Sequence, residues 1–158
     1  MYDWANSAFM VVIVTAIFPN YFASIVAADL PPATASTYLA VATTIALAIV
    51  AVLAPILGAY ADYRATRKRL LSVCLGLGVL STAGLYFVER GDWSLALCLF
   101  TFGNVGAAGS IVFYDSLLPH IARKDEIDRI STSGYALGYL GGGLLFATNV
   151  AWIIKPDF

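Results

Sequence analysis

Most of the side chains that could do chemistry lie in two short charged stretches. The first, GAYADYRATRKR, places Asp62 shortly before a basic cluster, and the second, FYDSLLPHIARKDEIDR, contains Asp115 and the single histidine, His120. Asp62 and Asp115 each lie close to several cations, an arrangement that suits ion pairing. Nucleophilic or general acid–base catalysis requires groups that converge on one point, and neither stretch supplies them. We therefore expect no enzymatic activity and no metal or cofactor.

The remainder of the chain is apolar and long enough to position these stretches at membrane boundaries. Hydrophobic residues make up 60% and charged residues 12%, against about 25% charged in soluble domains, and the mean hydropathy is +0.81. A helix needs about 20 apolar residues to cross a bilayer. Five tracts meet this length, at about 7–28, 38–60, 70–88, 93–114 and 131–154. They predict an all-α, multi-pass membrane protein with five transmembrane helices.

Basic residues are distributed unevenly over the loops between these tracts. Seven lie after the second and fourth tracts, namely Arg64, Arg67, Lys68, Arg69, Arg123, Lys124 and Arg129. The opposite side has Arg90 and Lys155. Lys and Arg in short loops favour the cytoplasm, so we expect a cytoplasmic N-terminus. No basic stripe with interleaved aromatic residues points to nucleic acid, and the lipid bilayer is the expected surrounding.

The first tract begins with polar residues in MYDWANSAF. Asp3, Asn6 and Ser7 are three and four residues apart and share one helical face. One interpretation is interfacial capping, because a carboxylate is favourable at a helix N-terminus. The other is a polar face turned into the helix bundle beside a transport path, and on that interpretation Asp3 and Asn6 are candidate path residues.

A few polar residues occur deeper in the tracts. Asn104 should face the bundle interior, either to bond another helix or to line a solute path. Tyr135 and Tyr139 are one turn apart, and they either pack or line a cavity for an organic solute. Thr43 and Thr44 can bond their own helix backbone.

Small residues recur at helical spacing in the fourth and fifth tracts, at Gly103, Gly106, Ala107 and Ser110 and at Gly134, Gly138 and Gly142. Such residues allow close helix packing in membranes, and a second interpretation is that they let helices slide during a transport cycle. Pro19 and Pro55 each remove a helical hydrogen bond, so we expect kinks there.

The stretch after the second tract resembles the G-x3-D…R-[KR]-[RK] signature of the major facilitator superfamily. This resemblance implies a cytoplasmic gate containing Gly58, Asp62, Arg67 and Arg69. MYDWANSAF, GAYADYRATRKR, FYDSLLPHIA and SGYALGYLGGGLL together resemble the vacuole-effluxer-like branch, which includes the autophagy-related vacuolar amino-acid permease and bacterial homologues. The implied activity is secondary transport of small organic solutes, amino acids among them, by alternating access.

Asp115 extends the expected gate. A carboxylate near a helix C-terminus is unfavourable, so we expect a cationic partner, either Arg67 or Arg69, with Arg129 as the next choice.

The family pattern has about twelve spans in two halves, whereas five are found here. We therefore expect an N-terminal fragment, without the sixth span and second half, whose missing partner is the C-terminal half of the same transporter. A non-transporting fragment or assembly subunit is the alternative. The implied location is a bacterial inner membrane, or the vacuolar membrane in a eukaryote. The fourth tract lacks the arginine of proton antiporters, and Tyr139 stands where their glycine motif has proline.

Overall fold

The structure is a computed structural model that describes residues 2–64, 66–123 and 126–155, without the side chains of residues 62, 64 and 119–121. The described residues form helices and no strand. Five helices among them are long and apolar enough to cross a membrane: Tyr2–Val26, Pro32–Ala61, Arg67–Phe87, Trp93–Leu118 and Ile127–Ile154. The expected all-α class with five transmembrane helices is confirmed.

The first span changes helix type along its length. Its elements are α1 (Tyr2–Ala8), the π-helical η1 (Phe9–Ile17), α2 (Phe18–Tyr21) and the π-helical η2 (Phe22–Val26). Pro19 lies between the two π-helical parts and has no N–H to donate. The Asn20 side-chain amide donates to the Ala16 carbonyl at 2.8 Å, which supplies a bond within the turn that Pro19 interrupts. The helix type thus changes on both sides of Pro19, and the kink expected there stays a prediction.

The other spans are longer than the apolar tracts that predicted them. They are α3 (Pro32–Arg64), α4 (Arg67–Gly84) with the 3-10 turn η3 (Leu85–Phe87), α5 (Trp93–Ile121) and α6 (Ile127–Ile154). Helix α3 begins at Pro32 because a proline in the first helical position loses no hydrogen bond. It then continues as one helix through Pro55. Helix α5 runs past Asp115 to Ile121, so Asp115 does not end the helix.

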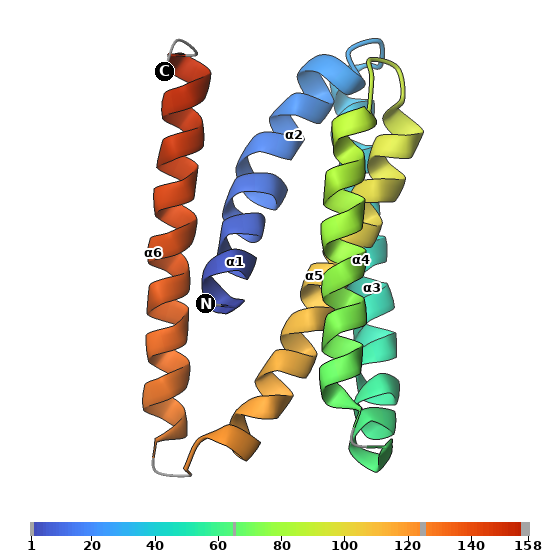
Figure 1. Cartoon of the computed structure of the whole chain (residues 1–158). Coiled ribbons are helices and arrows are strands. Elements are labelled where there is room, and N and C mark those ends of the chain that lie inside the picture. The colour runs from blue at the N-terminus through green and yellow to red at the C-terminus, as the bar shows by residue number, and fades with distance from the viewer. Residues whose placement is uncertain (1, 65, 124–125, 156–158) are drawn as a thin grey trace. The chain divides into compact units, whose positions relative to one another are not determined.

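The chain divides into two compact units, one of residues 1–20 with 121–158 and one of residues 21–120. In the first unit α1 lies beside α6 (Figure 1). Asp3 is next to Gly134 and Ser7 is next to Gly138, so the two helices are parallel. Parallel first and fifth spans are what the expected topology requires.

In the second unit α4 and α5 form an antiparallel pair at a glycine crossing. A Cβ atom placed on Gly106 would lie 2.7 Å from the Gly78 Cα and 2.7 Å from the Cys74 carbonyl oxygen. Gly103, Gly106, Ala107 and Ser110 are all buried. The predicted close packing of the fourth span is confirmed, and its partner is the third span.

Candidate functional site

The polar face of α1 lies against the glycine face of α6, within the first unit. A Cβ atom on Gly134 would lie 2.7 Å from Asp3 Oδ2, and one on Gly138 would lie 2.6 Å from Ser7 Oγ. Both distances are too short for a real side chain. The two glycines therefore provide the space that the Asp3 carboxylate and the Ser7 hydroxyl occupy. We call Asp3, Ser7, Gly134 and Gly138 the α1–α6 seam.

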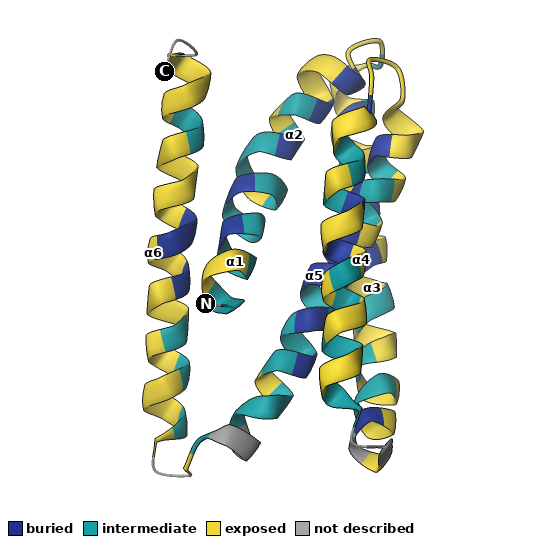
Figure 2. Ribbon diagram, viewed as in Figure 1, coloured by how far each residue is buried: buried dark blue, intermediate teal, exposed yellow. Residues whose placement is uncertain are grey.

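Apolar contacts continue this packing beside the seam. The Trp4 indole lies over Gly141, where a Cβ atom would overlap the ring. A Cβ atom on Gly142 would be 3.2 Å from Val11 Cγ2. Figure 2 shows that most of α6 is exposed, with its buried residues near the middle of the helix. Trp4 is 41% exposed, and the rest of its indole packs on α6. The run GGG at 141–143 was the sequence signal for this second contact.

The other candidate path residues on α1 and α6 are not among the four residues of the seam. Asn6 is half-buried but supplies none of the atoms nearest to the glycines of α6. Tyr135 and Tyr139 each follow a seam glycine by one residue, so they lie on the adjoining face of α6 and are exposed within this chain. The seam thus includes Asp3 but not Asn6 or the tyrosine pair, whose roles stay predictions.

Asn104 is buried in the second unit, with 7% of its surface exposed. Its side-chain amide donates to the Phe100 carbonyl at 2.9 Å, one turn back on α5. The bond to another helix that we considered is not seen among the described residues. Thr43 and Thr44 donate to carbonyls on their own helix, at 2.9 and 2.8 Å, which confirms the expectation for these two hydroxyls.

At the end of the second unit that was predicted to be cytoplasmic, Arg67 connects α4 to α5. Its Nη1 donates to the Ser116 carbonyl at 3.2 Å. A cation is favourable near the carbonyls at the C-terminal part of a helix. Arg67 thus reaches the residue beside Asp115, while the ion pair proposed for Asp115 stays a prediction.

The structure says less about the remaining predicted gate residues. Arg69 and Asp115 are exposed. A Cβ atom on Gly58 would have nothing within 4 Å among the described residues, so its role in the gate stays a prediction. The side chains of Asp62 and His120 lie outside the described part.

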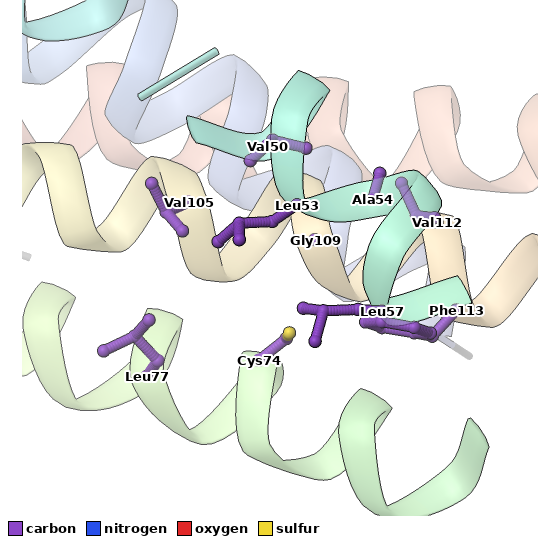
Figure 3. A pocket seen from close by; sticks show the side chains of 10 residues that line it. All are labelled: Val50, Leu53, Ala54, Leu57, Cys74, Leu77, Val105, Gly109, Val112 and Phe113. Atoms are coloured by element: carbon purple, nitrogen blue, oxygen red, sulfur yellow. The ribbon is translucent and has the colours of Figure 1, made fainter. Parts of the chain in front are cut away.

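A pocket of about 170 Å³ lies between α3, α4 and α5 (Figure 3). Leu53, Leu57, Leu77 and Val112 line it together with other apolar residues and the Cys74 thiol. An apolar cavity of about 150 Å³ stays dry and accepts hydrocarbons. This pocket therefore does not suit an amino acid or another charged solute, and it is not the candidate site.

The sequence motifs resemble one family, and comparison with known proteins tests that resemblance. A profile described as "Vacuole effluxer Atg22 like" matches residues 29–128. The chain belongs to this family. Like its vacuole effluxer-like relatives, it is a multi-pass integral membrane protein of the major facilitator superfamily. The resemblance read from the four motifs is confirmed.

A bacterial relative extends the match to almost the whole chain. The uncharacterized MFS-type transporter YxiO of Bacillus subtilis (strain 168) is 37% identical over 155 residues, which is 98% of this chain. The chain spans 36% of the length of that relative. No solved structure matches the chain. The relative points to the bacterial inner membrane as the location of this vacuole effluxer-like protein.

Proposed function

We propose that this chain forms the N-terminal part of a secondary transporter for small organic solutes, with amino acids as the first class to test. The observation that carries the proposal is the Asp3 carboxylate in the first turn of a membrane span, against the glycine face of a parallel span. Ionisable groups within membrane spans are costly and usually serve transport. Membership of the effluxer-like family and the MFS-type relative support the same function.

In this proposal the seam and the charged loops have different tasks. The Asp3 carboxylate and the Ser7 hydroxyl offer hydrogen-bond acceptors to an ammonium or hydroxyl group of a solute at one mouth of the path. Asp62, Arg67, Arg69 and Asp115 form the cytoplasmic gate and keep it closed through charge pairs. Alternating access then follows when these pairs break and form again as helices move.

Uptake measurements test this function. The longer protein is purified, reconstituted into proteoliposomes and supplied with a panel of labelled amino acids, and we expect accumulation or exchange of at least one. Secondary transporters place their sites between repeats, so we expect no uptake by the 158-residue chain alone. Absence of uptake across the whole panel by the longer protein would contradict amino acids as the solute class. Uptake by the short chain would instead contradict the need for a second half.

Asp62→Asn should slow transport without preventing membrane insertion. The substitution removes a charge from the proposed gate, and we expect a transport rate about 3- to 10-fold lower, equivalent to about 0.7–1.4 kcal/mol. The measurement is initial uptake rate normalised to inserted protein. Glu89→Gln is the control, because Glu89 is an exposed carboxylate outside this stretch. Equal rates for Asp62→Asn and the unmodified protein would show that Asp62 is an incidental loop acid.

A further inference from the structure

We propose that the loops at residues 27–31 and 88–92 form one fixed cluster that stays closed while the protein transports. We call the cluster the outer clasp, and it consists of Tyr21, Val26, Asp29, Tyr38, Val88, Arg90, Gly91 and Trp93. All of these residues belong to the second unit. The inference rests on the proposed transport function only for the claim that the clasp stays closed during the cycle.

An ion pair joins the two loops. Arg90 Nη2 lies 2.8 Å from Asp29 Oδ1 and donates a hydrogen bond to it. This hydrogen bond and the negative charge of Asp29 raise the pKa of the Arg90 guanidinium above its ordinary value. Both side chains are 67% exposed, and an exposed pair alone stabilises little. The other contacts must therefore supply most of the rigidity.

Two hydrogen bonds tie the loop after η3 to the end of the first span. The Gly91 amide donates to the Val26 carbonyl at 3.0 Å. Gly91 has a φ of +95°, a conformation that glycine adopts at little cost. The Tyr21 hydroxyl donates to the Val88 carbonyl at 3.2 Å, and this bond is partly buried. Because these bonds involve backbone groups, they fix the backbone conformation of the loop and not only the positions of its side chains.

An aromatic pair completes the clasp. The rings of Tyr38 in α3 and Trp93 at the start of α5 are stacked, with centroids 5.3 Å apart and planes at 28°. Such pairs add stabilisation beyond the area that they bury.

The four contacts have a common arrangement, because each one joins a residue before or within α3 to a residue between η3 and the first residue of α5. Separating the two loops would break all four together. We infer that the opening of the transport path at this end lies elsewhere in the protein and does not pass between these loops.

Distances between spin labels test the inference directly. Ala28→Cys and Glu89→Cys place labels on two exposed residues of the loops that make none of the four contacts, after Cys74 and Cys98 have been replaced by serine. In the longer protein in lipid nanodiscs, we expect one narrow distance distribution, unchanged by a mixture of amino acids or by acidification. A second, longer distance under either condition would overturn the fixed clasp, whether or not the protein transports amino acids.

A variant pair shows whether the named contacts hold the loops. Arg90→Ala combined with Tyr21→Phe removes the ion pair and one hydrogen bond, and we expect loss of the single narrow peak. Ser94→Ala is the control, since Ser94 is exposed next to Trp93 and makes none of the four contacts. A narrow peak retained in the double variant would show that the loops are held by something other than these contacts.

Discussion

Gly106→Ala should destabilise the protein by about 1–3 kcal/mol, the cost of forcing an extra methyl group into a close-packed site. The new Cβ atom would collide with backbone atoms of Gly78 and with the Cys74 carbonyl. Backbone atoms cannot move away as a side chain can, so α4 and α5 must separate. Thermal unfolding in detergent, followed by circular dichroism, measures the change.

Gly78→Ala is the matched control on the facing helix. A Cβ atom on Gly78 would lie 3.4 Å or more from its neighbours on α5, which is ordinary contact distance. We expect a stability close to that of the unmodified protein, as also for Gly76→Ala, which has open space. Equal destabilisation by Gly78→Ala and Gly106→Ala would contradict the described crossing of α4 and α5.

Gly138→Ala should disrupt the α1–α6 seam, with a similar loss of about 1–3 kcal/mol. The added Cβ atom would meet Ser7 Oγ at 2.6 Å and the Asp3 carbonyl oxygen at 3.0 Å. Because the second atom belongs to the backbone, α1 must shift away from α6. The readout is the unfolding temperature together with the exchange rate of the α1 amides.

Two further variants make this prediction specific to the seam. Gly143→Ala has nothing within 4 Å of its Cβ position, and we expect it to be neutral. Ser7→Ala removes the hydroxyl that the new methyl group would meet, so Ser7→Ala should restore part of the stability lost in Gly138→Ala. A Gly138→Ala protein that is as stable as Gly143→Ala would show that α1 does not pack on this face.

The apolar tracts were enough to predict five spans, because hydropathy and length decide whether a helix can cross a bilayer. They placed the helix ends less well. Pro32 starts α3 six residues before the apolar tract at 38–60, since backbone hydrogen bonds and not hydropathy determine where a helix begins. For the same reason α5 continues past Asp115 into a charged stretch.

Small-residue spacing predicted which faces pack but not which helices meet. Gly106 faces α4 and Gly138 faces α1, and the spacing within one helix contains no information about its partner. The outer clasp was not predicted at all. Its Asp29–Arg90 pair and its Tyr38–Trp93 stack join residues more than 50 positions apart, so only the fold brings them together. Opposite charges on two loops of the same predicted side were the available signal.

The role of the Asp3 carboxylate in the seam is the central claim, and uptake by Asp3→Asn in proteoliposomes tests it most directly. Asn keeps the shape of the side chain and removes its charge. We expect uptake to fall about tenfold or more, equivalent to about 1.4 kcal/mol, with an unchanged unfolding temperature. Glu126→Gln, an exposed carboxylate just before α6, should keep full uptake. Uptake by Asp3→Asn equal to that of the unmodified protein would contradict the account.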